Sequence, residues 1–176
     1  MKNDSLKIMV LEDQPLDQEL IKRTVKKAFP NAVFIVAQSK KEYLERLGWG
    51  APDVILSDYH IPGYNGLEAL LYAKEHFPFV PFLFVTGMLN DEEKAAEVIL
   101  KGAHGYVLKE NLSSLPPALE AVLKNNKALA AQRESLHKKE NKKKILLQKL
   151  QALLEQSSDF DTKGEALSVL EELQTL

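Results

Sequence analysis

The chain has 176 residues, 45% of them hydrophobic, and a formal net charge of −2 at pH 7. This length suits one well-filled domain with an appendage and is short for two full domains. The absence of cysteine excludes disulfides and thiolate metal sites. The N-terminus is polar and its apolar stretch, Ile8 to Leu11, is too brief for a signal sequence or a membrane span. We therefore expect a cytoplasmic protein that does not enter a membrane.

Charge is distributed unevenly along the chain. Residues 124–149 carry nine basic and two acidic side chains, whereas residues 150–176 carry one basic and six acidic side chains. A basic block can attract nucleic acid, but on a helix it is more often a solvated face. No helix-turn-helix pattern accompanies the block, so we expect no sequence-specific binding of nucleic acid. Any binding would depend steeply on salt.

Short apolar runs alternate with amphipathic segments over most of the chain. The apolar runs predict strands at residues 6–11, 32–37, 54–57, 82–85 and 105–108. Helical spacing predicts helices at residues 15–28, 40–47, 66–76 and 91–101, and a last one from about residue 114. Continuous apolar strands, each followed by an amphipathic helix, indicate an α/β fold. Its parallel sheet would be covered by helices on both faces, which is a doubly wound arrangement.

The last helix continues far beyond the fifth repeat. Apolar residues recur at 4-3 spacing from Leu115 to Leu154, which predicts one long helix to about residue 156. The middle of this seam is polar at Asn126, Arg133, Glu140 and Lys143. A uniform coiled coil is therefore not expected there, although the apolar ends favour a homodimer through the C-terminal helices.

A second, shorter helix is expected after the long one. Thr162 and Glu165 have capping-box spacing before an apolar run, which predicts a helix over about residues 162–175. The predicted organisation is thus one domain at residues 1–123 and a helical extension at residues 124–176.

Polar residues follow four of the predicted strands at the point where each strand ends. They are Glu12-Asp13, Asp58, Thr86-Gly87 and Lys109. In open α/β sheets, ligands bind outside the carboxyl ends of the strands, so these residues should meet at one edge. Each residue alone is unremarkable, because an acid after a strand is often a helix cap. Together, in this order, they predict a phosphate-handling site.

The three carboxylates of this group would repel one another unless they bind a cation or take up a proton. Mg²⁺ relieves this repulsion, because it prefers oxygen ligands and commonly bridges one or two carboxylates to phosphate oxygens. Lys109 adds a positive charge, and the Thr86 hydroxyl and the Gly87 N–H can donate to phosphoryl oxygens.

Taken with the turn Ile61-Pro62-Gly63 and with Gly66, these residues resemble the response-regulator receiver family of two-component signalling. Gly102-Ala103, leading to Tyr106 and Lys109, extends the resemblance to about residues 5–123. It implies a flavodoxin-like five-stranded sheet in the order 2-1-3-4-5. The Lys-Glu-Asn-Leu sequence at 109–112 is most similar to receivers associated with sensor kinases.

The resemblance implies that Asp58 is the phosphoacceptor and takes a phosphoryl group from a histidine kinase or a phosphotransfer protein. Asp13, Asp58 and the backbone carbonyl of His60 would bind Mg²⁺ directly, and Glu12 would act largely through water.

The resemblance also assigns the phosphoryl contacts and a switch. Thr86, Gly87 and Lys109 would contact the phosphoryl group, and Thr86 and Tyr106 would move together when it binds. The chain would pass this signal to its helical extension. It would not be an enzyme beyond its own phosphorylation and dephosphorylation.

One residue departs from the family pattern. Receivers usually have proline after the site lysine, commonly joined by a cis bond, whereas Glu110 follows Lys109 here. A cis bond before a non-proline residue costs about 3 kcal/mol, so we predict a trans peptide and a shifted loop.

Two other functions fit parts of the pattern. The chain can be the receiver part of a larger hybrid sensor kinase. A phosphohydrolase of the haloacid-dehalogenase type also uses an aspartate nucleophile and Mg²⁺, but it needs an acid two residues later, where this chain has His60. His137 lacks an acidic neighbour to activate its ring, so we interpret it as a solvated histidine.

Overall fold

The computed structural model describes residues 5–87, 92–156, 168–169 and 173. The chain divides into two compact units, Met1–Asn126 and Lys127–Leu176. The first contains the sheet and its helices, and the second contains most of the last helix.

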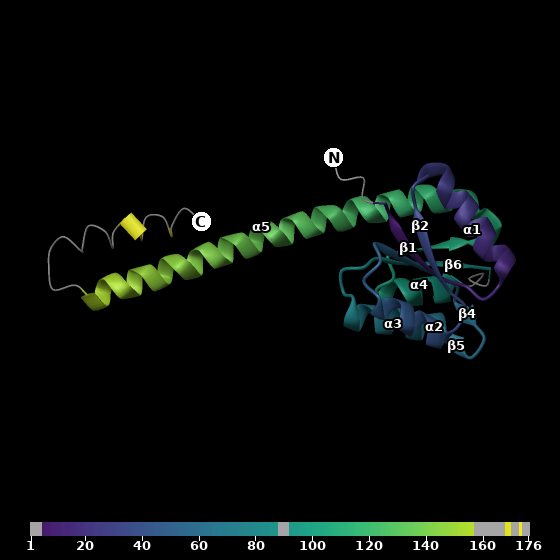
Figure 1. Cartoon of the computed structure of the whole chain (residues 1–176), viewed down its shortest axis with the longest axis horizontal. Coiled ribbons are helices and arrows are strands. Elements are labelled where there is room, and N and C mark those ends of the chain that lie inside the picture. Colours follow the sequence, from purple (N-terminus) through teal and green to yellow (C-terminus); the bar gives the residue numbers. More distant parts are fainter. Residues whose placement is uncertain (1–4, 88–91, 157–167, 170–172, 174–176) are drawn as a thin grey trace. The chain divides into compact units, whose positions relative to one another are not determined.

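The first unit is built on a five-stranded parallel sheet (Figure 1). Its strand order is β2-β1-β3-β6-β7, which is the predicted order 2-1-3-4-5. The three central strands are almost entirely buried, as their continuous apolar sequences predicted. The strands are β1 (Lys7–Leu11), β2 (Val33–Ala37), β3 (Val54–Ser57), β6 (Phe82–Thr86) and β7 (Gly105–Leu108).

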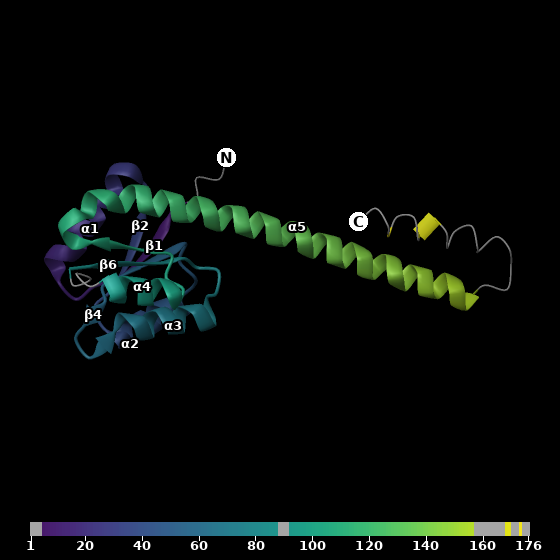
Figure 2. The same ribbon diagram turned by 180° about the vertical axis from the view of Figure 1, so that it is seen from behind.

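Helices cover both faces of the sheet, which confirms the doubly wound α/β fold (Figure 2). One face packs against α1 and the start of α5, and the other against α2, α3 and α4. The helices are α1 (Pro15–Ala28), α2 (Lys40–Gly48), α3 (Gly66–His76), α4 (Glu92–Leu100) and α5 (Leu115–Gln156).

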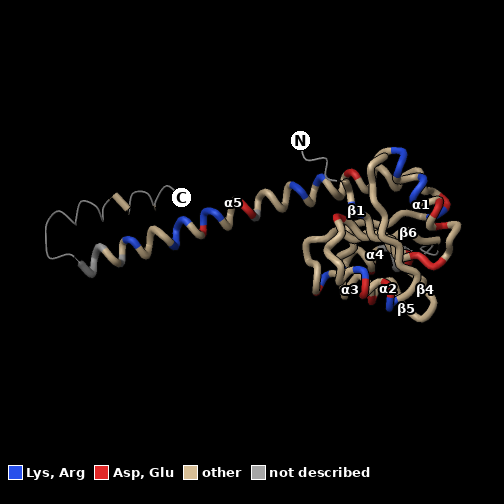
Figure 3. Tube along the Cα trace, in the orientation of Figure 1, with Lys and Arg blue, Asp and Glu red and all other residues tan. Residues whose placement is uncertain are grey.

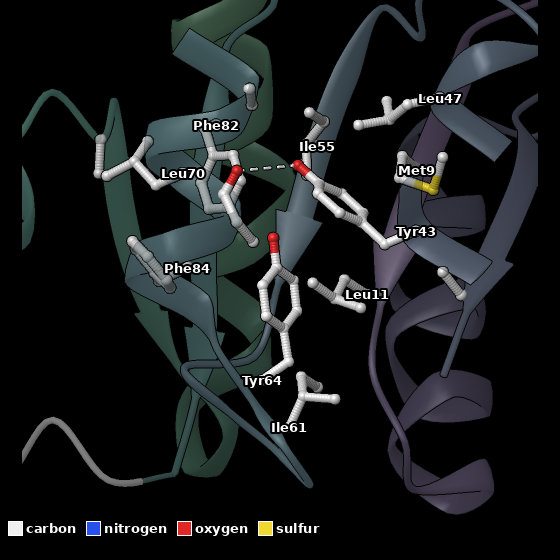
Figure 4. Packing of buried hydrophobic residues seen from close by; sticks show 14 of the residues in the cluster. Met9, Leu11, Tyr43, Leu47, Ile55, Ile61, Tyr64, Leu70, Phe82 and Phe84 are labelled. Atoms are coloured by element: carbon white, nitrogen blue, oxygen red, sulfur yellow. Dashed lines mark hydrogen bonds between the residues drawn. The ribbon is translucent and has the colours of Figure 1, made fainter. Parts of the chain in front are cut away.

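The core beneath α2 and α3 contains two tyrosines among its aliphatic side chains (Figure 4). Tyr43 is fully buried, and its hydroxyl donates to the carbonyl of Ala69 at 3.1 Å. Burial raises the pKa of Tyr43, and of Tyr64 to about 12. Both tyrosine side chains therefore stay neutral, and the hydrogen bond from Tyr43 links α2 to α3 across the core.

Side-chain hydrogen bonds cap the N-termini of α2 and α3. The Ser39 hydroxyl accepts from the Glu42 N–H at 3.3 Å at the start of α2, and Asn65 Oδ1 accepts from the Leu67 N–H at 2.9 Å at the start of α3. Each cap occupies one of the N–H groups that a helix start leaves unpaired.

The turn after Asp58 forms a short antiparallel hairpin that the sequence did not predict. It consists of β4 (His60–Ile61) and β5 (Tyr64–Asn65), and Gly63 has a φ of 71° at its tip. The Gly66 N–H then donates to the carbonyl of Tyr59 at 2.8 Å. The hairpin thus closes the loop that carries Asp58 and leads directly into α3.

After β7 the chain forms a 3₁₀ helix, η1 (Lys109–Ser114), which also was not predicted. The Lys109–Glu110 peptide is trans, as predicted from the missing proline. The 3₁₀ helix occupies the loop whose shift was expected, and α5 follows it without a gap.

The predicted long C-terminal helix is confirmed as α5. Lys and Arg residues recur along its length beyond Asn126 (Figure 3). In the second unit Leu146 and Val169 are buried. The predicted helix at 162–175 lies outside the described residues, apart from residues 168, 169 and 173. Across the described part of the chain, we find no helix with the length and apolar character needed to cross a membrane.

We predict that Gly66→Ala destabilises the protein by about 2–3 kcal/mol, because overpacking against rigid atoms has this cost. A Cβ at residue 66 would lie 2.5 Å from the carbonyl oxygen of Asp58 and 2.8 Å from Cα of Tyr59, and neither backbone atom can move away cheaply. Urea unfolding measures the effect. Gly48→Ala is the matched control, because a Cβ there meets nothing within 4 Å. Equal losses in the two variants would contradict this packing argument.

We also predict a pH-dependent contribution from His104. Its Nδ1 accepts from the Phe82 N–H at 3.2 Å, and burial and the nearby Lys74 lower the pKa of His104. A lowered folded-state pKa means that the unfolded chain takes up the proton first, so stability falls as pH drops below about 6.5. The urea midpoint should fall less between about pH 7.5 and 5.5 in His104→Gln than in the wild type. His137→Gln, on the exposed surface of α5, should keep the wild-type difference.

Candidate phosphate and metal site

Four of the residues predicted at strand ends meet at the carboxyl edge of the sheet. Glu12 and Asp13 directly follow β1, Asp58 follows β3, and Lys109 follows β7. The parallel register explains this, because Leu11 pairs with Ser57 and brings the ends of β1 and β3 side by side. The Asp58 N–H donates to the Leu11 carbonyl at 2.8 Å, which extends this pairing by one residue.

The carboxylates of Glu12, Asp13 and Asp58 form a compact oxygen cluster. Each offers one oxygen, and these oxygens lie within 4.8 Å of one another. Glu12 is fully buried, whereas the other two are partly exposed. Burial raises the pKa of Glu12 above its usual value, although contacts with Lys109 oppose that shift. The cluster is thus open to solvent on one side and closed on the other.

Lys109 supplies the positive charge of the site. Its Nζ lies 2.8 Å from Asp58 Oδ2 and 2.6 Å from Glu12 Oε2. Burial alone would lower the pKa of Lys109, but its hydrogen bonds to carboxylates raise it overall, so the side chain stays charged. The ammonium bridges the ends of β1, β3 and β7.

The structure adds three side chains that the sequence analysis missed. Asp17 lies in the first turn of α1, and its Oδ2 atom is 2.7 Å from Lys109 Nζ. The Gln14 amide donates to Asp13 Oδ2 at 2.7 Å, and the buried Gln18 amide donates to the Glu12 carbonyl at 2.8 Å. The only available signal was the helix start at Pro15, shortly after Asp13, which places the first turn of α1 near this edge without fixing which side chains face the site.

Backbone groups hold the other oxygen of Asp58. The Tyr59 N–H donates to Oδ1 at 2.6 Å, and the His60 N–H lies 3.4 Å from the same atom. His60 therefore adjoins the carboxylate through its backbone, and its own side chain is exposed. The proposed role of the His60 carbonyl in metal binding stays a prediction.

The remaining predicted residues lie on the two neighbouring strands. Thr86 ends β6 and is buried, and Gly87 follows it at the surface. Tyr106 lies on the edge strand β7, pairs with Phe84 and is 43% exposed. Tyr106 is thus a partly exposed residue of this structure.

The donor set fits Mg²⁺. Three carboxylates meet there, and Asp17 adds a fourth negative charge next to the single ammonium. Glu12 Oε2 is buried and, among the described residues, has no hydrogen-bond partner beyond its ion pair with Lys109. An all-oxygen cluster with excess negative charge suits a hard divalent cation, which keeps several waters.

The fold and this edge define a class of protein: a parallel α/β domain with an acidic cluster and a lysine at its carboxyl edge. The model of the response regulator receiver domain matches residues 8–120. The chain therefore belongs to the response-regulator receiver family, as the sequence resemblance indicated.

Curated relatives are similar over the same region. The glycerol metabolism activator of Pseudomonas putida is 28% identical over 122 residues, which cover 68% of this chain and 55% of that protein. The transcriptional regulatory protein DegU of Brevibacillus brevis is 30% identical over 110 residues, which cover 62% of this chain and 46% of that protein. The chain thus spans about half the length of these curated relatives.

Solved structures show the same fold. The response regulator receiver domain protein of Clostridium thermocellum superposes with a TM-score of 0.62 at 24% identity, covering 70% of this chain and 98% of that one. The chemotaxis response regulator CheY4 of Vibrio cholerae gives a TM-score of 0.60 at 24% identity, covering 67% and 98%. At this identity the likeness supports the fold alone.

We predict that Asp13→Asn weakens Mg²⁺ binding at least tenfold, because it removes one charged oxygen ligand from the cluster. Asp53→Asn is the matched control. Asp53 lies just before the opposite end of β3, and its carboxylate accepts from the Lys7 N–H. Mg²⁺ titration followed by amide NMR signals of Tyr59 measures both affinities. If the two variants bind Mg²⁺ equally well, the cluster is not the metal site.

Proposed function

We propose that this receiver accepts a phosphoryl group on Asp58 from a histidine kinase or a phosphotransfer protein, with Mg²⁺ bound by the neighbouring carboxylates. The contact between Lys109 Nζ and Asp58 Oδ2 at 2.8 Å carries the proposal. It places a charged ammonium against the carboxylate that directly follows β3, the middle strand of the sheet. Such a cation neutralises charge on an incoming phosphoryl group.

The proposed reaction is a direct phosphoryl transfer. An oxygen of Asp58 forms a bond to phosphorus as the bond between phosphorus and the donor imidazole nitrogen breaks, and that nitrogen keeps the electron pair. Bound Mg²⁺ would supply charge neutralisation on the phosphoryl oxygens. Lys109 would donate to one of these oxygens, and Thr86 and the Gly87 N–H would donate to others. The chain's own contribution is positioning, which accounts for a large share of such rate enhancements.

Asp58 is prepared for this role by its surroundings. The Tyr59 N–H and the Lys109 ammonium each hold one of its oxygens, so the carboxylate has a defined orientation before the donor arrives. At 12% exposure its side chain can still be reached from outside. A haloacid-dehalogenase-type hydrolase would need an acid at position 60, where this chain has histidine. The aspartate and the metal site that suggested such a hydrolase are accounted for by the match to the receiver family.

The proposed output passes through Thr86 and Tyr106 to the helical extension. Thr86 pairs with Leu108 on β7, the same strand that carries the exposed Tyr106, so a change at Thr86 acts on that strand. Leu129, Leu136 and Leu147, which belong to the predicted 4-3 seam of α5, are 50%, 54% and 47% exposed. An apolar stripe of this kind supports a homodimer or a helical partner. We propose no sequence-specific contact with nucleic acid.

We predict that beryllofluoride with Mg²⁺, which mimics a phosphoryl group, changes the NMR signals of Tyr106 or the oligomeric state in size-exclusion chromatography. The reason is that the mimic adds negatively charged ligands at Asp58 and draws Thr86 and Lys109 toward them. Asp58→Asn should abolish both responses, and Asp53→Asn should keep them. If Asp58→Asn responds like the wild type, the proposed function is wrong.

A further inference from the structure

Asp17 contacts Lys109 from α1, a helix that contributed no residue to the predicted site. Its Oδ2 lies 2.7 Å from Lys109 Nζ, across 92 residues of sequence. Asp17 belongs to the first turn of α1, where Pro15 occupies the first position, so the helix start directs this carboxylate toward the strand ends. Its side chain is 31% exposed.

Carboxylate oxygens surround the Lys109 ammonium closely. Its Nζ donates hydrogen bonds to Asp17 Oδ2 at 2.7 Å and to Asp58 Oδ2 at 2.8 Å, and Glu12 Oε2 lies 2.6 Å from it as an ion pair. A phosphoryl group on Asp58 brings new oxygen atoms that need hydrogen-bond donors. Three carboxylate oxygens already lie within 2.8 Å of Nζ, so a phosphoryl oxygen that binds Lys109 has to displace one of them.

Exposure decides which contact can be released most easily. Glu12 is fully buried, and a buried carboxylate that loses its cation has no water to replace it. Asp17 is partly exposed, so water can take the place of the ammonium at small cost. Asp58 carries the incoming group and stays close to Lys109. The carboxylate that yields is therefore that of Asp17.

We propose that Asp17 is a positioning residue that holds the Lys109 ammonium in the phosphate-free protein and opposes phosphoryl binding at Asp58. This inference rests on the proposed function of Asp58 as phosphoacceptor. Asp17 opposes binding in two ways: it competes for a Lys109 N–H, and its negative charge repels the incoming phosphoryl oxygens. It thereby influences how readily a phosphoryl donor can transfer its phosphoryl group to Asp58.

The test measures beryllofluoride affinity at saturating Mg²⁺ in the full chain. Asp17→Asn should bind beryllofluoride about tenfold more tightly than the wild type, as expected for removal of one competing hydrogen bond between charged groups. Asp17→Glu keeps the charge and can still reach the ammonium, so it should restore wild-type affinity. Glu19→Gln removes a charge from the exposed side of the same helix, where Glu19 pairs with Lys22, and should leave the affinity unchanged. Thermal unfolding checks that all variants are folded.

A second background tests whether Asp17 acts through Lys109. Lys109→Gln should weaken beryllofluoride binding without abolishing it, because glutamine keeps N–H donors at this position. In that background Asp17→Asn should have less effect, since the ion pair between Asp17 and the Lys109 ammonium is absent and only the repulsion by the Asp17 charge remains to be removed. An undiminished effect would mean that Asp17 acts by charge alone and not through Lys109, and would overturn its role as a positioning residue.

The two proposals fail in different ways. If wild-type protein shows no Mg²⁺-dependent beryllofluoride binding, the proposed function falls and this inference falls with it. If the wild type binds but Asp17→Asn binds equally or more weakly, only the role of Asp17 is overturned.

Discussion

One ammonium group at the carboxyl edge of the sheet organises this receiver. Lys109 lies within 2.8 Å of three carboxylate oxygens, which belong to the end of β1, the start of α1 and the end of β3. Without that cation the carboxylates would repel one another in a partly buried place. With it, the edge still keeps an excess of negative charge. That excess makes a divalent cation a natural further component of the site.

The position of Lys109 also connects the site to the rest of the chain. Lys109 is the first residue of η1, and η1 leads directly into α5. A movement of the lysine backbone therefore acts on the chain immediately before the long helix. The other connection is the pairing of Thr86 with Leu108, since β7 also carries the exposed Tyr106. The site thus adjoins a strand and a helix, the two elements to which the proposed switch would connect.

The loop after Asp58 restricts the backbone that positions the Asp58 carboxylate. The hairpin of β4 and β5 and the close approach of Gly66 to the Asp58 carbonyl leave little freedom for the backbone behind the carboxylate. Only glycine fits at position 66, because a Cβ would overlap backbone atoms. The sequence Pro62-Gly63 signalled a turn. It did not show that the turn would pair with itself, because two-residue strands leave no periodic pattern to read.

The hydrophobic pattern predicted the five strands of the parallel sheet and the helices α1 to α5 to within one or two residues, since buried parallel strands and amphipathic helices each leave a periodic signal. It also predicted that Glu12, Asp13, Asp58 and Lys109 would meet, because parallel strands bring their carboxyl ends to one edge. Asp17, Gln14 and Gln18 escaped prediction. Polar residues in a first helical turn are common caps, and only the packing of α1 decides whether they face solvent or the site.

What the sequence by itself determined is the α/β repeat, the strand order expected of its family and the chemical character of the carboxyl edge. These follow from local periodicity and from the general geometry of parallel sheets. The tertiary structure alone decided that Lys109 reaches a carboxylate on α1 as well as those after β1 and β3, and that Tyr106 lies partly exposed. Such contacts depend on side-chain distances between elements far apart in the chain, and no local pattern encodes those distances.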